Sequence, residues 1–153
     1  MELILWRHAE AEPRSPDKPD EARALTEKGQ KQARRMADWL AGSLPDDCRI
    51  LCSPAVRTVQ TAEALGRNFK TTGALAHDAS AADILQAAGW PDQAEPVLVV
   101  GHQPTLGHVV SLLIAGRQQD WHLRKGSICW IASKGDSGQP YLKAVLGADL
   151  AGK

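Results

Sequence analysis

Leu3-Ile4-Leu5-Trp6-Arg7-His8 is the stretch that decides how this chain folds. Its apolar run, with a β-branched and an aromatic member, is typical of a strand that is buried on both faces. Arg7 and His8 follow the run directly. Open parallel sheets bind ligands outside the carboxyl ends of their strands. The pair would therefore lie at the usual position of a binding site, unless a strand simply ends here in surface polar residues.

The length and charge of the chain limit what it can be. Its 153 residues fit one domain, which we expect to span 1–153. Acidic and basic residues balance at 18 each, so a nucleic-acid or membrane partner held by bulk charge is not expected. There is neither an apolar run of the roughly 18 residues that span a membrane nor the basic start of a signal peptide. A cytoplasmic location is expected.

The three cysteines are Cys48, Cys52 and Cys129. Their odd number and their place in or beside predicted strands fit small buried side chains better than a disulfide framework. Cys48 and Cys52 could begin a zinc site, but a second pair of ligands is missing. We therefore expect neither disulfides nor a zinc centre.

The first half of the chain alternates strands and helices. The segment 11–25 is rich in proline and charge, which predicts a loop. Thr26 is the expected N-cap of a helix over 27–41, where apolar residues recur at helical spacing. A short buried strand over 50–52 follows.

Ser53 and Pro54 predict a second helix that runs to about Leu65, with Ser53 as its N-cap. Arg57 falls in the first turn, where side chains lean back toward the N-terminus. A cation there opposes the helix dipole, at a cost of about a few tenths of a kcal/mol, unless an anion is bound. Arg57 is therefore a candidate anion ligand, and the alternative is an arginine in solvent or paired with Glu63.

The second half continues the alternation. The clearest buried parallel strand, over 96–100, ends at Gly101 and His102. His108 is expected to be a packing residue within the next helix. The other predicted elements are a strand over 71–75, helices over 79–88 and 106–114, and strands over 126–133 and 141–146 joined by a turn at 134–138. The fold class is α/β, a three-layer α/β/α sandwich with a mostly parallel central sheet.

Three predicted strands are thus followed by Arg7 and His8, by Arg57 and by His102. Because the carboxyl ends of parallel strands meet at one edge of a sheet, these side chains should gather there together with helix N-termini. Arginines bind phosphate oxygens with two parallel hydrogen bonds, and helix N-termini offer free N–H groups to the same anion. The pattern predicts a site for a tetrahedral dianion.

A metal-dependent hydrolase is the main alternative. Glu10 and Glu12 could join His8 and His102 as ligands of a cation. The two nearby arginines would repel that cation, which disfavours a metal site. A glycine-rich P-loop is absent from the sequence, so a Walker-type nucleotide site is not expected.

These motifs resemble the signature of the histidine phosphatase superfamily, which has the phosphoglycerate mutase-like fold. The resemblance rests on Arg7-His8, Ser53-Pro54-x-x-Arg57-x-x-Gln60-Thr61-Ala62 and Val100-Gly101-His102. The stretch Arg7-His8-Ala9-Glu10-Ala11, with Arg23-x-Leu25-Thr26-x-x-Gly29-x-x-Gln32-Ala33, is more similar to the SixA-type phosphohistidine phosphatases. The similarity covers roughly residues 1–115, and Ala9 replaces the glycine that many members carry after Arg-His.

The resemblance implies a metal-independent phosphatase without a cofactor. His8 would attack phosphorus and form a phosphohistidine intermediate, for which its imidazole must be neutral. Arg7 and Arg57 would lower the pKa of His8 and keep it neutral. With His102 they would also hold the phosphoryl oxygens in the transition state.

The proton donor to the leaving group is less well defined. Asp20 matches the acidic position that SixA-like proteins carry before Arg-x-Leu-Thr, Glu10 is the second candidate, and a solvated carboxylate is the alternative. Arg23 is a further phosphate ligand, a loop anchor or a surface residue. The segment 77–89 is too short for the lid of the larger family members. The resulting open site favours a phosphorylated protein side chain as substrate.

Three functions follow in order of preference. The first is dephosphorylation of phosphohistidine in a protein, such as a histidine phosphotransfer domain in signal transduction. The second is a general small-molecule phosphomonoesterase, and the third is a catalytically silent phosphate-binding module. The expected partner is a phosphorylated protein or a small phosphoester, with no nucleic acid and no membrane. The oligomeric state stays open, a monomer included.

Overall fold

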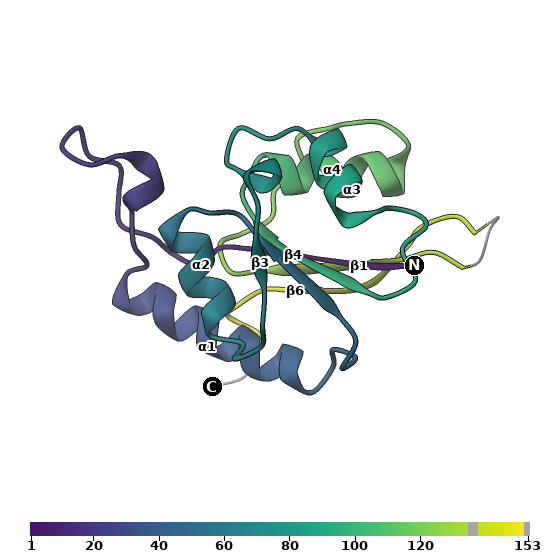
Figure 1. Ribbon diagram of the computed structural model, residues 1–153, viewed down its shortest axis with the longest axis horizontal. Helices are drawn as coiled ribbons and strands as arrows, with labels where there is room; N and C mark the ends of the chain where they lie inside the picture. Colours follow the sequence, from purple (N-terminus) through teal and green to yellow (C-terminus); the bar gives the residue numbers. More distant parts are fainter. Residues whose placement is uncertain (135–137, 152–153) are drawn as a thin grey trace.

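The structure is a computed structural model, and it describes residues 1–134 and 138–151. Within these residues a central sheet has the strand order β3-β2-β4-β1-β5-β6 (Figure 1). The strands are β1 (Glu2–Arg7), β2 (Arg49–Cys52), β3 (Lys70–Thr71), β4 (Val97–Gly101), β5 (Ile128–Ala132) and β6 (Tyr141–Leu146). The first four run parallel to one another, whereas β5 is antiparallel to β1 and β6 is antiparallel to β5.

Helices cover both faces of the sheet. On one face lie α1 (Glu27–Ala41) and α2 (Val56–Glu63), and on the other lie α3 (Ala81–Ala88) and α4 (Thr105–Ala115) (Figure 1). Two short 3₁₀ helices, η1 (Asp20–Ala22) and η2 (Gly73–Leu75), belong to the connections. The predicted α/β/α sandwich with a mostly parallel sheet is therefore confirmed.

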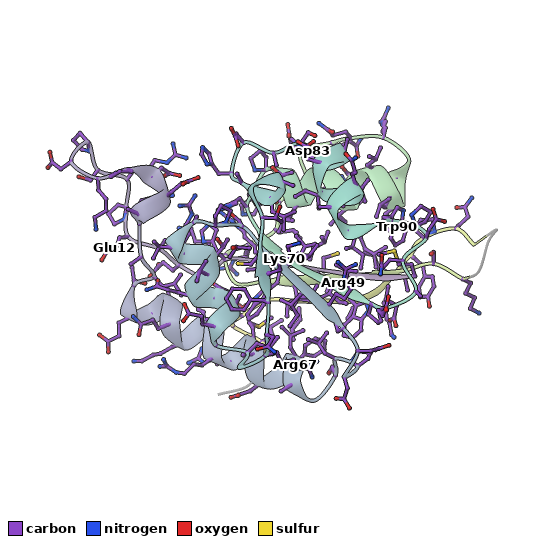
Figure 2. All side chains as sticks on the ribbon, in the orientation of Figure 1. Glu12, Arg49, Arg67, Lys70, Asp83 and Trp90 are labelled. Atoms are coloured by element: carbon purple, nitrogen blue, oxygen red, sulfur yellow. The ribbon has the colours of Figure 1, made fainter. Side chains whose placement is uncertain are left out.

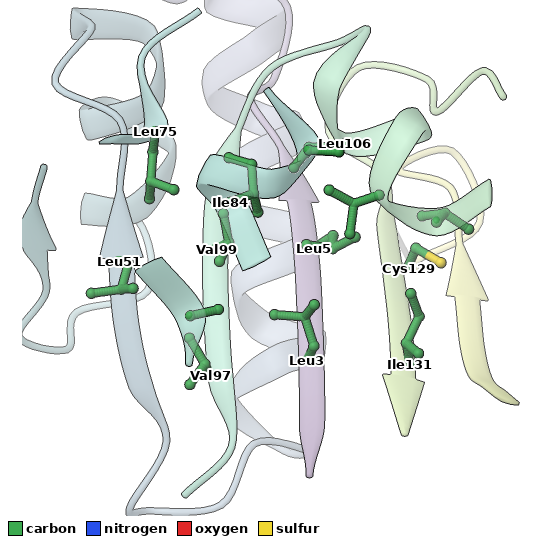
Figure 3. Packing of buried hydrophobic residues seen from close by; sticks show 14 of the residues in the cluster. Leu3, Leu5, Leu51, Leu75, Ile84, Val97, Val99, Leu106, Cys129 and Ile131 are labelled. Carbon is green, nitrogen blue, oxygen red and sulfur yellow. The ribbon is translucent and has the colours of Figure 1, made fainter. Parts of the chain in front are cut away.

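The apolar run of β1 supplies both cores, because successive side chains of a strand point to opposite faces. Leu3 and Leu5 pack in the cluster that α3 and α4 cover, where Figure 3 shows them beside Val97 and Val99 of β4. Ile4 and Trp6 belong to the cluster on the α1 and α2 face. All four β1 side chains are 0% exposed, and each contributes roughly 1.5–3 kcal/mol of hydrophobic stabilisation.

The pairing register aligns the carboxyl ends of three strands. Arg7 of β1 lies opposite Gly101 of β4, and Cys52 of β2 lies opposite Val100. The ladder continues past the strand ends, since the His8 N–H donates to the Gly101 carbonyl (3.1 Å) and the Ser53 N–H to the Val100 carbonyl (3.1 Å). The residues that follow β1, β2 and β4 are thereby held at one edge of the sheet.

The segment between β1 and α1 projects from this same edge. Ala11 and Leu25 form an isolated antiparallel bridge that closes its base. Figure 2 shows Glu12 at this end of the molecule, with Trp90 at the opposite end. The 3₁₀ helix η1 is part of the segment, so the predicted loop carries one short helical turn.

The predicted elements are found in the structure, and the main differences lie at the start of α2 and in the segment predicted as a strand over 71–75. Helix α1 has the predicted bounds, and Thr26 caps it by accepting from the Gly29 N–H (3.0 Å). Helix α2 begins at Val56 rather than Pro54, and its N-cap is Ala55 because the Ser53 hydroxyl is hydrogen-bonded to His102 instead. The strand predicted over 71–75 is only Lys70–Thr71, followed by η2. The predicted turn at 134–138 lies partly outside the described residues, although β5 and β6 pair as expected.

The cysteines are free thiols, as expected. Cys52 and Cys129 are buried, and this burial raises the pKa of each thiol to about 12. Cys48 is half-buried, and its burial raises the pKa to about 11. In the part of the chain that the structure describes, no helix has the length and apolar character needed to cross a membrane.

Gly29 allows α1 to cross the segment after β1 at very short range. A β-carbon at this position would overlap the Glu10 carbonyl oxygen. We expect Gly29→Ala to lower the free energy of unfolding by about 2 kcal/mol, because the backbone must shift, and thermal denaturation to show a Tm lower by roughly 4–8 °C. Gly73→Ala is the matched control, since its β-carbon would meet nothing within 4 Å. Equal Tm values for the two variants would contradict this expectation.

Candidate active site

A cavity of about 210 Å³ lies at the edge of the sheet where the strand ends meet. It is lined by Arg7, His8, Ala11, Arg14, Arg23, Arg57, His77, His102, Gln103, Pro104 and Lys125. The four residues predicted from the strand ends are therefore brought together, with the rings of His8 and His102 5.4 Å apart between centroids. No carboxylate side chain is among the lining residues, so the cavity is strongly cationic.

His8 is held as a neutral imidazole with one defined tautomer. Its ring is 6% exposed, and Nδ1 lies 2.7 Å from the Ala9 carbonyl oxygen. Because a carbonyl only accepts, Nδ1 carries the hydrogen and Nε2 keeps its lone pair. Burial is the largest cause that lowers the pKa of His8 to about 4, and Arg57, Arg7 and Arg23 lower it further, against the hydrogen bond to Ala9.

His102 is oriented by Ser53. Its Nε2 lies 2.7 Å from the Ser53 hydroxyl oxygen, which also accepts a long hydrogen bond from the Ala55 N–H (3.5 Å). With the Ser53 hydroxyl as the donor to Nε2, His102 carries its own proton on Nδ1. Burial first, and then the charge of Arg57, lower the pKa of His102 to about 3. The ring is thus a neutral hydrogen-bond donor through Nδ1.

Both arginines are anchored through Nη1, whereas the Nε of each has no hydrogen-bond partner within the described residues. Arg7 donates from Nη1 to the Leu123 carbonyl (2.7 Å), and Arg57, 2% exposed, donates from Nη1 to the Asp20 carbonyl (2.8 Å). Among the described residues, Nε of Arg7, Nε of Arg57 and Nδ1 of His102 are buried without a hydrogen-bond partner. Each buried unpaired donor costs about 1–3 kcal/mol. All three nitrogens belong to residues that line the cavity.

Asp20 lies beside the cavity, where it forms ion pairs with Arg57 and Arg23. Its carboxylate lies 3.0 Å from Nη2 of Arg57 and 2.9 Å from Nε of Arg23. Burial raises the pKa of Asp20, but the two guanidiniums together lower it below its usual value. An ionised carboxylate cannot donate a proton, which argues against the predicted role of general acid. The alternative pairing of Arg57 with Glu63 is wrong, because Asp20 is its partner.

Glu10 is not brought into this cavity. Its carboxylate accepts from the Thr26 hydroxyl (2.7 Å) and lines a neighbouring cavity. Arg23 does line the site, where its Nη1 donates to the Glu12 carbonyl (2.8 Å) and anchors the loop. The suggested metal centre is not formed either: in residues 1–134 and 138–151, no group of three or more His, Cys, Asp or Glu side chains could hold a metal ion.

His77 is a site residue that the sequence did not reveal. Its ring centroid lies 6.4 Å from that of His102, and it lines the same cavity. His77 follows η2 rather than a strand, so the pattern of polar residues after strands could not find it. His108, in contrast, pairs with Asp120 (2.7 Å) and lies outside the cavity, as expected of a packing residue.

The chain is similar in sequence and in fold to several known proteins. Residues 3–80 match the sequence family described as histidine phosphatase superfamily (branch 1). Phosphohistidine phosphatase SixA of Escherichia coli (strain K12) is 29% identical over 124 residues, which cover 76% of each chain. A candidate SixA structure from Nakamurella multipartitia is 29% identical with a TM-score of 0.76 and 95% coverage of both chains. One from Agrobacterium tumefaciens, at 24% identity, 95% and 97% coverage and a TM-score of 0.80, shares the fold.

Because both imidazoles are buried, we expect each to titrate well below the ordinary pKa of histidine. NMR titrations, assigned with His8→Gln and His102→Gln, should give midpoints near a pKa of about 4 for His8 and about 3 for His102. The unfolded chain takes up these protons at about pH 6.5. The free energy of unfolding should therefore decrease as the pH falls from about 6.5 through the folded pKa values. A midpoint at or above the ordinary histidine value in the folded protein would contradict the neutral site.

Proposed function

The chain belongs to the histidine phosphatase superfamily, whose match spans about half of its length, and on this basis we propose that this hydrolase removes phosphoryl groups from phosphohistidine in a protein. One observation supports phosphohistidine as the substrate. The cavity holds a neutral nucleophile and several cations, and the carboxylate of Asp20, which pairs with two of its lining arginines, is kept ionised by Arg57 and Arg23. The site therefore favours a leaving group that departs without help from a carboxylic acid.

In the first step, Nε2 of His8 attacks phosphorus. The new N–P bond forms as the P–N bond of the substrate phosphohistidine breaks, so the phosphoryl group passes from one imidazole to another. Arg7, Arg57 and Nδ1 of His102 donate to the phosphoryl oxygens and balance their charge. These are the donors that lack a partner within the described residues.

The leaving group decides between two substrate classes. A phosphohistidine that is protonated on its other ring nitrogen, for which an imidazole has an ordinary pKa of about 6.5, leaves as a neutral imidazole and needs no further proton. An alcohol leaves as a far stronger base and needs a positioned acid. With Asp20 ionised and Glu10 turned to another cavity, the phosphoramidate fits this site better than an alkyl phosphoester.

In the second step, water attacks phosphorus from the opposite side. The bond between phosphorus and Nε2 of His8 breaks, its electron pair returns to the imidazole, and inorganic phosphate leaves. The low pKa of His8 keeps the regenerated imidazole ready for the next turnover. We assign Asp20 as the residue that positions Arg57, and Arg23 as the anchor of the loop that carries Asp20. The cytoplasmic location, the relay partner and the single domain over 1–153 stay predictions from the sequence.

Replacing the nucleophile tests the proposal directly. We expect His8→Ala to lower kcat on a phosphohistidine protein by on the order of 10³-fold or more, because no other group forms the covalent intermediate. His108→Ala, which alters a histidine outside the cavity, is the control and should keep the parental rate. The assay measures phosphate release with EDTA present. Parental activity in His8→Ala, or complete loss in EDTA, would refute the mechanism.

The Asp20→Asn variant tests whether Asp20 positions Arg57 or donates a proton to the leaving group. We expect kcat/KM to fall about tenfold, because Arg57 loses one charge-assisted hydrogen bond worth roughly 1.5 kcal/mol. The factor should be the same for phosphohistidine and for aryl phosphates of different leaving-group pKa. A loss that grows steadily with the leaving-group pKa would instead restore Asp20 as the proton donor.

A further inference from the structure

A second cavity, of about 480 Å³, adjoins the candidate active site, and Arg7 and Lys125 line both. We call it the basic groove. Its walls come from α1 and from the segment 122–125 that precedes β5. Its cationic lining residues are Arg7, Lys28, Lys31, Arg35, Arg124 and Lys125. The proposed function does not use any of them except Arg7.

The charge of the groove is a local property. Six lysine and arginine side chains face two carboxylates, Glu10 and Asp149, across it, whereas the whole chain has a net charge of zero. Arg124 lies 3.7 Å from Asp149, in a pair whose side chains are both more than half exposed, and such pairs contribute little. Within the described residues, no ion pair engages Lys28, Arg35 or Lys125.

The α1 wall presents its cations in a regular row. Lys28, Lys31 and Arg35 are exposed and follow one another at intervals of three and four residues, so they lie on one face of the helix, along about 10 Å. The buried residues of α1 lie on its other side, against the sheet. The row is therefore exposed to a partner, with only Lys31 in a long, exposed ion pair with Glu27 (3.9 Å).

We propose that the basic groove binds an acidic segment of the phosphoprotein substrate, beside the residue whose phosphoryl group enters the His8 cavity. The inference rests on the proposed function and names the surface of the partner that this chain recognises. Carboxylates spaced three or four residues apart on a partner helix would match the row on α1. A nucleic-acid strand fits less well, because its binding depends on contacts to many phosphates by a basic protein, and this chain has a net charge of zero.

Charges at the rim of a site mainly change the rate at which a partner associates and its binding affinity. Neutralising the row should therefore raise KM for an acidic substrate and leave kcat unchanged. The preference for acidic substrates should also weaken as salt screens the charges.

The experiment uses two synthetic phosphohistidine peptides of equal length, one flanked by Asp and Glu and the other by Ser and Gln, together with free phosphohistidine. The parent should show about a tenfold lower KM for the acidic peptide at low salt, equivalent to roughly 1.4 kcal/mol. Lys28→Glu with Arg35→Glu should abolish this preference, while free phosphohistidine is hydrolysed at the parental rate. Arg49→Glu with Lys70→Glu, at exposed positions outside both cavities (Figure 2), is the charge-matched control.

Three results would overturn the inference. One is an unchanged preference in the Lys28 and Arg35 variant. Another is an equal loss of preference in the control. The third is stronger competition by a single-stranded oligonucleotide than by the unphosphorylated acidic peptide, which would assign the groove to nucleic acid. If the parent hydrolyses no phosphohistidine probe, the proposed function fails by itself, and fluorescence anisotropy with the unphosphorylated acidic peptide still decides whether the groove binds it.

Discussion

The pairing of β1 with β4 is the constraint on which the rest of this structure depends. Strand β1 is hydrogen-bonded on both edges and buried on both faces, so its end cannot shift without breaking the sheet and both cores. Two consequences follow from its register with Gly101. His8 is fixed through a backbone hydrogen bond to β4, and His102 is fixed one residue beyond the same strand. The sheet thus fixes the backbone positions of both histidines, and their ring centroids lie 5.4 Å apart.

Several cations lie close together in the site, and a carboxylate of the chain offsets part of their charge. Arg57 is almost fully buried, and its guanidinium is offset by the carboxylate of Asp20. That ion pair has a chemical consequence, since the carboxylate that neutralises Arg57 is no longer available as an acid. The histidines respond to the same environment in the opposite sense, because burial and nearby cations keep both imidazoles neutral. One electrostatic arrangement thus keeps the imidazole of His8 neutral, as the proposed nucleophile requires, and keeps the carboxylate of Asp20 ionised.

In the function proposed here, substrate recognition and phosphoryl transfer would use different parts of the same edge of the sheet. The strand ends form the small cavity around His8, whereas the exposed face of α1 contributes to the basic groove. Arg7 lines both, so a segment bound in the groove would lie next to the phosphoryl group. Because charges on α1 lie outside the His8 cavity, they can change partner choice without altering the chemistry. Such a division would let the proposed phosphatase select a protein substrate through charges outside the His8 cavity.

The sequence alone determined the framework and the composition of the site. The apolar run of β1 and the polar residues after β1, β2 and β4 predict a parallel sheet and a cationic pocket with Arg7, His8, Arg57 and His102, because the periodicity of burial and the direction of strands are local properties. Only the tertiary structure decided how each group is used. It placed Asp20 against Arg57, turned Glu10 away and brought His77 beside His102. Those outcomes depend on how loops cross the sheet edge, and ion pairs between residues far apart in the chain leave no periodic signal in the sequence.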